Sequence, residues 1–136
     1  MTKLPATKPP STKQPSARRQ HAERLGRLAE TKAAMLLRLK GYRISAQRWK
    51  SPAGEIDLIV RRGSTVAFVE VKARSTADDA LASVGPYQRR RIVQAAHHWL
   101  AANPDAADCD CRFDIVLVTP YQWPQHIANA FASDDQ

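Results

Sequence analysis

Two short apolar segments carry acidic and basic side chains at alternate positions. The first contains Glu55 and Asp57, and the second contains Glu70 and Lys72. Alternate residues of a β-strand emerge on the same face of a sheet. If the two segments are paired strands, the two carboxylates and the lysine lie together on one face, which is a candidate site for acid–base or metal chemistry.

The turn between the segments sets their register. Gly63-Ser64 suits a two-residue hairpin turn with glycine at the first position. This turn places Asp57 opposite Glu70 and Glu55 opposite Lys72. A turn at Arg62-Gly63 would shift the pairing by two residues and preserve the face, whereas a three-residue loop would reverse it. Four apolar side chains are then expected on the opposite face: Ile56, Leu58, Val69 and Val71.

Two carboxylates directly across a strand pair repel each other, so something must compensate them. A divalent cation such as Mg²⁺ would do so, because it prefers carboxylate oxygens and can activate water beside a phosphate. Lys72 could then hold or polarise that water. The alternative is an ordinary cross-strand ion pair between Glu55 and Lys72. The apolar neighbours favour a site, because interior carboxylates are costly unless they are paired or metal-bound.

Hydrophobic periodicity predicts two helices. Apolar residues recur at helical spacing from His21 to Lys40, and Gly41 suits the position after a helix end. Pro86 suits the first turn of a second helix that Asn103-Pro104 ends. Residues 73–83 carry no periodicity and are predicted as a loop.

Alternating apolar residues predict the strands. A first strand begins near Tyr42 and closes at the turn Ser51-Pro52-Ala53-Gly54, and the others cover Glu55–Val60, Val66–Lys72 and Phe113–Val118. Gln125–Phe131 is either an edge strand or a short turn. The fold class is therefore α/β, with a mixed β-sheet in α-β-β-β-α-β order flanked by helices.

At this point several motifs resemble a known family. The chain resembles the YraN-type family of bacterial proteins, and its Asp-x12-Glu-x-Lys spacing is similar to that of the PD-(D/E)XK nuclease superfamily, which includes archaeal Holliday-junction resolvases. The matching motifs are Gly26-Arg27-Leu28-Ala29-Glu30, Gly41-Tyr42, Gly54-Glu55-Ile56-Asp57-Leu58-Ile59, Phe68-Val69-Glu70-Val71-Lys72 and Arg112-Phe113-Asp114. The resemblance extends from about Glu23 to Phe131.

The resemblance implies a restriction-endonuclease-like core and a role for each residue of the motif. Asp57, Glu70 and the Val71 carbonyl would bind Mg²⁺ or Mn²⁺, and Lys72 would be the catalytic lysine. Glu30 matches the acidic residue that completes the site in resolvase-like members. The implied function is metal-dependent hydrolysis of phosphodiester bonds in branched or structured DNA. The alternative is a non-catalytic nucleic-acid-binding module that retains the fold.

Two positions depart from the family pattern. Ile56 stands where the superfamily name has a proline, although that proline is often absent. Gln88 stands where YraN-type relatives usually carry a lysine. A glutamine can still orient water or a phosphate, but the direct charge is lost.

The charge balance favours an anionic partner. The chain has 136 residues, with 21 Lys or Arg against 13 Asp or Glu and a net charge of +8. Residues 1–20 hold five of these cations, no acid and four of the nine prolines, so we expect a disordered basic arm before one nuclease-like domain over residues 21–136. A solubilising extension, a nucleic-acid-binding arm and a cleaved transit peptide all fit this composition.

Basic side chains within the domain are the candidates for phosphate binding, with DNA expected rather than RNA. They are Arg89, Arg90, Arg91, Arg48, Lys50 and Arg74. No apolar stretch is long enough to span a membrane, so we expect a cytoplasmic protein; a homodimer is left open. Arg112 and Asp114 form either a structural ion pair or a phosphate clamp, and His126 has no partner at a recognisable spacing.

Overall fold

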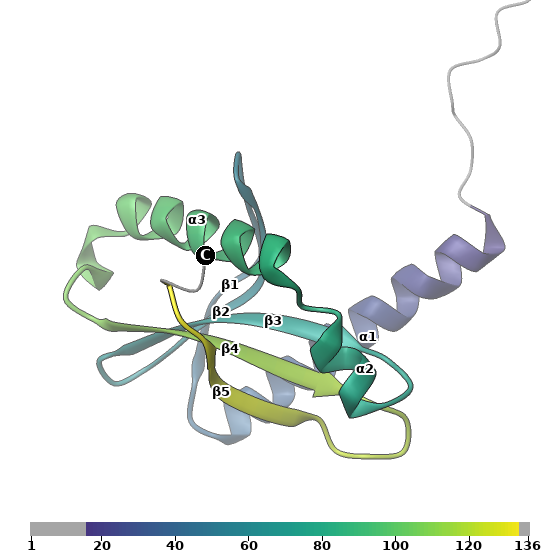
Figure 1. The fold of residues 1–136 in the computed structure, drawn as a ribbon. Coiled ribbons are helices and arrows are strands. Elements are labelled where there is room, and N and C mark those ends of the chain that lie inside the picture. Colours follow the sequence, from purple (N-terminus) through teal and green to yellow (C-terminus); the bar gives the residue numbers. More distant parts are fainter. Residues whose placement is uncertain (1–15, 134–136) are drawn as a thin grey trace, which may run out of the picture.

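A five-stranded sheet with the spatial order β1-β2-β3-β4-β5 forms the centre of the molecule (Figure 1). The computed structural model describes residues 16–133. The strands are β1 (Arg43–Ser51), β2 (Gly54–Arg62), β3 (Thr65–Ala73), β4 (Asp110–Val118) and β5 (Gln125–Phe131). Only β3 and β4 are parallel to each other, and the other neighbours are antiparallel. The final segment is thus an edge strand, which decides between the two alternatives predicted for it.

Helices cover both faces of this sheet (Figure 1). They are α1 (Ala17–Leu39) on one face, α3 (Pro86–Ala102) on the other, the short α2 (Ala77–Ala82) and the 3-10 turn η1 (Pro104–Ala106). The mixed α/β class predicted from sequence is confirmed and is compatible with a restriction-endonuclease-like core. Within residues 16–133, no helix is long and apolar enough to cross a membrane.

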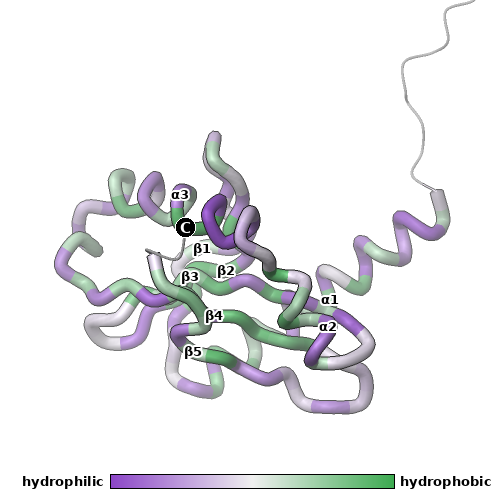
Figure 2. Tube along the Cα trace, in the orientation of Figure 1, coloured by the Kyte–Doolittle hydropathy of each residue, from purple (hydrophilic) through white to green (hydrophobic). Residues whose placement is uncertain are grey.

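The sheet separates two hydrophobic cores, and its middle strands are the most hydrophobic part of the chain (Figure 2). On the α3 face, Phe68 packs against Trp99 and Phe113, with ring centroids 5.7 and 5.6 Å away. On the α1 face, Ala33 and Leu37 pack on the sheet and are fully buried. Helices on both sides hold the central strands rigid, which fixes any side chain at their ends.

The first helix begins earlier than predicted and ends where predicted. Ser16 caps it by accepting a hydrogen bond from the Arg19 backbone at 3.1 Å, so residues 17–20 are helical and not part of a disordered arm. Residues 1–15, the rest of the predicted arm, lie outside the described residues. Gly41 has φ +92°, and the backbone N–H of Tyr42 bonds to the Leu37 carbonyl, which is a Schellman ending.

The hairpin of β2 and β3 has the predicted turn. Gly63 has φ +60° and Ser64 does not have a positive φ, as a type II′ turn requires. The register pairs Arg62 with Thr65 and continues to Leu58 opposite Val69. The predicted register is therefore confirmed over these residues.

The predicted loop at residues 73–83 is wrong in part, because it contains α2. Thr76 caps this helix by accepting a hydrogen bond from the Asp79 backbone at 3.1 Å, and acidic Asp78 and Asp79 in the first turn favour the helix dipole. Only Ala80 is buried, so six residues give too little periodicity to be recognised.

Hydrogen bonds and ion pairs around the buried Asp114 of β4 hold β5 against the sheet. The fully buried Asp114 carboxylate accepts hydrogen bonds from Arg112 at 2.9 and 2.8 Å, from His126 Nε2 at 2.7 Å and from the Asn129 backbone at 2.9 Å. Burial opposes ionisation, but these donors outweigh it and lower the pKa of Asp114 to about 2. Arg112 and Asp114 thus form a structural ion pair.

His126, for which the sequence offers no partner at a recognisable spacing, contacts Lys40 and Asp114. Lys40 Nζ lies 2.6 Å from its Nδ1. An ammonium group only donates, so Nδ1 accepts and Nε2 carries the proton that is donated to Asp114. The imidazole therefore connects the end of α1 to β4.

We predict that Asp114→Ala destabilises the protein by about 3 kcal/mol, because it leaves Arg112 without its carboxylate beside a buried site. Asp105→Ala is the matched control. It removes the partner of Arg61 in a pair whose acid is 74% exposed, and it should cost less than about 1 kcal/mol. Urea unfolding curves of the three proteins measure both values, and equal losses would contradict the assignment.

Candidate active site

The site lies where β2 and β3 separate. Their pairing ends at Leu58 and Val69, and beyond this point the Val71 backbone donates to Asp57 Oδ2 at 2.8 Å. The Asp57 side chain thus accepts the hydrogen bond from the Val71 N–H that a backbone carbonyl of β2 would accept in a continued ladder. The two strands diverge, and the space between them opens at the carboxyl end of β3.

The divergence overturns part of the predicted pairing. The ladder does not extend to Asp57 and Glu70 or to Glu55 and Lys72, and Glu55 pairs instead with Lys50 of β1. Ile56 packs with the α3 core, whereas Leu58 packs with the α1 core, so the strict alternation predicted for β2 fails at Asp57.

A residue of β1 with a positive φ lies opposite this break. Arg48 lies between the two residues that pair with Ile56 and Leu58, and it has φ +50°, a conformation that is uncommon outside glycine. The break in alternation is thus shared by both strands of the first hairpin.

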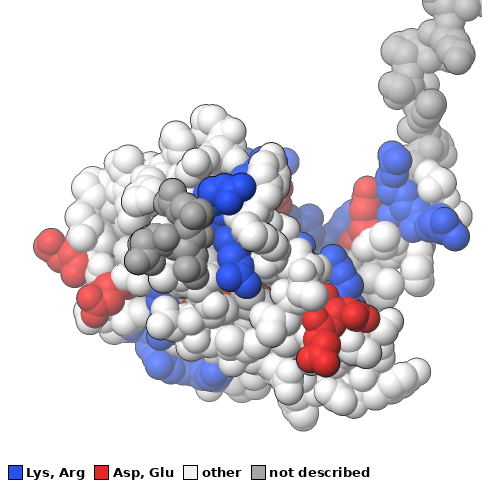
Figure 3. Space-filling view, in the orientation of Figure 1, with Lys and Arg blue, Asp and Glu red and all other residues white. Residues whose placement is uncertain are grey.

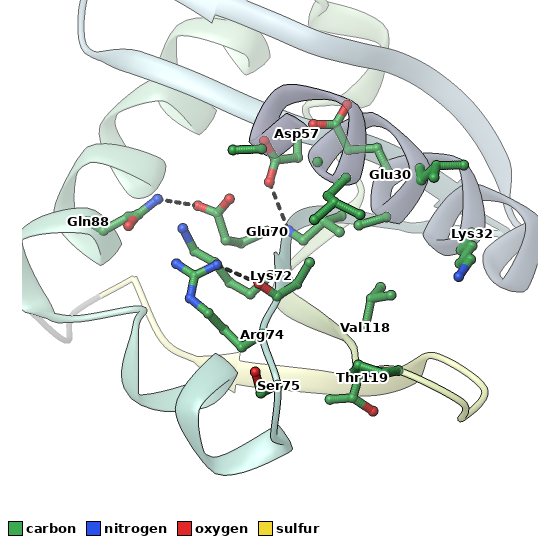
Figure 4. Close-up of a pocket in the computed structure, with 18 of the residues that line it drawn as sticks. Glu30, Lys32, Asp57, Glu70, Lys72, Arg74, Ser75, Gln88, Val118 and Thr119 are labelled. Carbon is green, nitrogen blue, oxygen red and sulfur yellow. Dashed lines mark hydrogen bonds between the residues drawn. The ribbon is translucent and has the colours of Figure 1, made fainter. Parts of the chain in front are cut away.

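Glu70 is a buried carboxyl group, only 5% exposed. Gln88 of α3 donates to its Oε2 at 2.6 Å, and Asp57 and Lys72 extend toward it (Figure 4). Burial raises the pKa of Glu70 to about 9, with a further rise from the neighbouring Asp57; Lys72 and Gln88 oppose this shift only weakly. Without a cation, Glu70 therefore favours its protonated form near neutral pH.

These groups line one large cleft with a volume of about 1240 Å³. Its walls are the first half of α1, the start of α3, the first residues of β2 and the segments that follow β3 and β4. The carboxyl ends of parallel strands are the usual location of ligand sites in open α/β sheets. The position of the cleft therefore agrees with that of a binding site.

The donor set at the separation point fits a hard divalent cation. Asp57 and Glu70 supply carboxylate oxygens, and the proton that burial favours on Glu70 is what a cation would displace. Val71 donates its N–H toward β2, so its carbonyl faces the same gap, since both groups of a strand residue point to one side. Mg²⁺ commonly takes one or two carboxylates and keeps several waters.

Glu30 lies in the cleft wall, but its carboxylate bonds to Arg48 Nε at 2.6 Å. Within the described chain, no group of three or more His, Cys, Asp or Glu side chains could hold a metal ion together. In this arrangement Glu30 anchors Arg48 and stands beside the Asp57–Glu70 pair (Figure 4).

The candidate phosphate-binding residues do not form one patch. Arg74 and Arg91 line the cleft, whereas Arg48 and Lys50 line a smaller neighbouring groove. On the face in Figure 3, Lys and Arg side chains lie in separate groups. Of the three adjacent arginines Arg89, Arg90 and Arg91, only Arg91 lines the cleft.

Helix geometry explains why these three arginines separate. Successive side chains of a helix point about 100° apart. Arg89 donates to the Val84 carbonyl and lies over Phe131, whereas Arg91 donates to the Ala53 carbonyl in the turn between β1 and β2.

Sequence reasoning missed several cleft residues. Ser75 and Thr119 follow β3 and β4, and Tyr87 and Tyr121 are exposed aromatic residues at the start of α3 and in the loop after β4. The position of Tyr121 after a predicted strand and beside Pro120 was a usable signal.

Comparison with known proteins agrees with the motifs. Residues 29–118 match the family described as "Uncharacterised protein family UPF0102". A UPF0102 protein of Parvibaculum lavamentivorans is 56% identical over 110 residues, which cover 81% of this chain and 83% of that protein. Another, from Paramagnetospirillum magneticum, is 52% identical over 119 residues, which cover 85% of this chain and 92% of that protein. The YraN-type resemblance is thereby confirmed, and nuclease superfamily membership is consistent with it: the chain belongs to the UPF0102 family.

Proposed function

We propose that this protein is a metal-dependent endonuclease that hydrolyses phosphodiester bonds in branched or structured DNA. The observation that carries the proposal is the buried Glu70 carboxyl group held against Asp57, with Lys72 beside it, in a cleft between two helices. A carboxyl group whose pKa is raised by burial and by a second carboxyl group is typical of functional sites.

Asp57, Glu70 and the Val71 carbonyl would hold Mg²⁺ or Mn²⁺. When bound, such an ion neutralises charge on a phosphate and lowers the pKa of water. Gln88 fixes the orientation of Glu70 through its hydrogen bond. Lys72 would place its ammonium group beside the scissile phosphate, where it can polarise the attacking water or balance developing negative charge.

Cations along the cleft would hold the nucleic acid backbone. Lys32, Arg74 and Arg91 line the same cleft as the carboxylates. An anionic polymer that approaches an acidic site needs such cations around it. Symmetric cutting of two strands would require two copies of this site, so a homodimer remains part of the proposal for branched substrates.

Two observations favour the alternative, a nucleic-acid-binding module without turnover. Glu30 is bound to Arg48, and Gln88 supplies no charge. Metal-dependent cleavage of a panel of branched, single-stranded and duplex substrates separates the two functions.

We predict that Lys72→Ala abolishes cleavage and leaves nucleic-acid affinity within a few-fold of wild type. One cation among 21 contributes little to binding, whereas its position at the reacting phosphate is specific. Lys50→Ala is the control, because it removes the same charge from the neighbouring groove and should retain turnover. Equal cleavage by Lys72→Ala and wild type would exclude Lys72 from the mechanism.

Glu70→Gln should raise the melting temperature of the metal-free protein. The pKa of Glu70 is raised from 4.5 to about 9, so its stabilising contribution is complete below the lower value and is lost as pH rises toward the higher one. The stability of Glu70→Gln does not fall with this titration, so its melting temperature should exceed that of wild type by an amount that grows from pH 4.5 toward about 9. Thermal melts in chelator at several pH values measure the difference.

Addition of millimolar Mg²⁺ or Mn²⁺ should then stabilise wild type and not Glu70→Gln, because a ligand of the folded state stabilises it by mass action. Glu55→Gln makes the same chemical change at an exposed cleft residue and should follow wild type. A destabilised Glu70→Gln that responds to metal like wild type would exclude the metal site.

A further inference from the structure

Apart from the half-buried Trp49, the aromatic residues of the described chain divide into a buried set and an exposed set. Phe68, Phe113, Phe131, Trp99 and Tyr42 are buried. Tyr87, Tyr121 and Trp123 are 65%, 104% and 76% exposed. Of the exposed three, Tyr87 and Tyr121 line the cleft that holds Asp57 and Glu70.

Exposed apolar side chains concentrate at this cleft. Eight large hydrophobic residues in the described chain are exposed, and four of them line the cleft: Leu25, Leu28, Tyr87 and Tyr121. Single exposed hydrophobic residues need no explanation, but a group of them around one cleft marks a binding surface.

Both tyrosines are attached to the elements that carry the reactive groups. Tyr87 precedes Gln88, which bonds to Glu70, and the guanidinium of Arg91 lies 5.7 Å from the centre of its ring. Tyr121 closely follows the end of β4, where Val118 pairs with Ala73, the residue after Lys72. The rings therefore border the site from the α3 side and from the loop after β4.

The conformation of Tyr121 adds to the argument. Its φ is +61°, in the left-handed region that bulky residues rarely adopt, and its side chain has no cover. Backbone strain of this kind persists where the surroundings impose it, and it is concentrated at ligand-binding sites.

We propose that Tyr87 and Tyr121 stack on unpaired bases, so that the substrate is a nucleic acid with a single-stranded segment beside the reactive phosphate. This inference rests on the proposed function and names its substrate class. Lys32, Arg74 and Arg91 supply charge complementarity for the phosphates in the same cleft. Bases in a duplex have their faces covered by neighbours, whereas an unpaired base offers a face to an aromatic ring.

Binding in chelator tests the proposal without turnover. The probe is a fluorescein-labelled oligothymidylate of about 12 nucleotides, compared by anisotropy with a duplex of the same length. Tyr87→Ala and Tyr121→Ala should each weaken binding to the single strand about tenfold, and Tyr→Phe at either position should retain it. The dependence of affinity on salt should not change, because no cation is removed.

Trp123→Ala is the matched control, since Trp123 is an exposed aromatic residue that does not line the cleft. Its affinity should equal that of wild type. An oligomer of abasic sites keeps the phosphates and removes the bases, so wild type should bind it weakly. The tyrosine variants should bind this oligomer with the same affinity as wild type. No single-strand binding by wild type, an unchanged affinity in both alanine variants, or the same loss on the abasic oligomer would overturn the stacking proposal.

The two proposals fail separately. Loss of single-strand affinity in Tyr87→Ala and Tyr121→Ala can be measured on a protein that has no nuclease activity. Conversely, metal-dependent cleavage that does not depend on either tyrosine would leave the nuclease proposal intact and exclude the stacking role.

Discussion

A buried carboxyl group beside a second one is stable only if a proton or a cation neutralises the pair, and Glu70 beside Asp57 imposes this constraint here. The surrounding structure holds the two carboxyl groups in this arrangement. The α3 helix supplies Gln88 to orient Glu70, and the Val71 backbone holds Asp57 in place. Because the same Asp57 bond ends the β2–β3 ladder, the feature that fixes the carboxylate also opens the cleft.

The parts of the fold that follow from local rules were predictable from sequence. Gly63-Ser64 determines the hairpin register, and Gly41 ends α1 in a left-handed conformation. Pro86 starts α3, and alternation identifies the strands. The same register predicted that Asp57 lies near Glu70 and that something must compensate them; the two acids do interact, although the strand ladder ends one residue earlier.

The structural features that could not be predicted from sequence depend on contacts between distant residues. Ile56 departs from strict alternation because a side chain of β2 replaces a backbone acceptor. His126 contacts Lys40, which is 86 residues away, and Glu30 of α1 bonds to Arg48 of β1. The burial that raises the pKa of Glu70 depends on how tightly α3 and the diverging strands cover it. None of these has a signature in residue spacing.

Asp114 pairs with Val69, the residue before Glu70, so the two acids lie on neighbouring strands, yet they differ in chemistry. Asp114 is satisfied by Arg112, His126 and a backbone amide, and it stays ionised. Glu70 accepts a hydrogen bond from Gln88, but burial and the neighbouring Asp57 outweigh it and raise the pKa of Glu70 to about 9. The most direct measurement of that difference is calorimetric titration of the protein with Mn²⁺ near neutral pH in buffers of different ionisation enthalpy. The account predicts release of about one proton per bound ion in wild type and none in Glu70→Gln; binding of Mn²⁺ without proton release, or no binding at all, would contradict it.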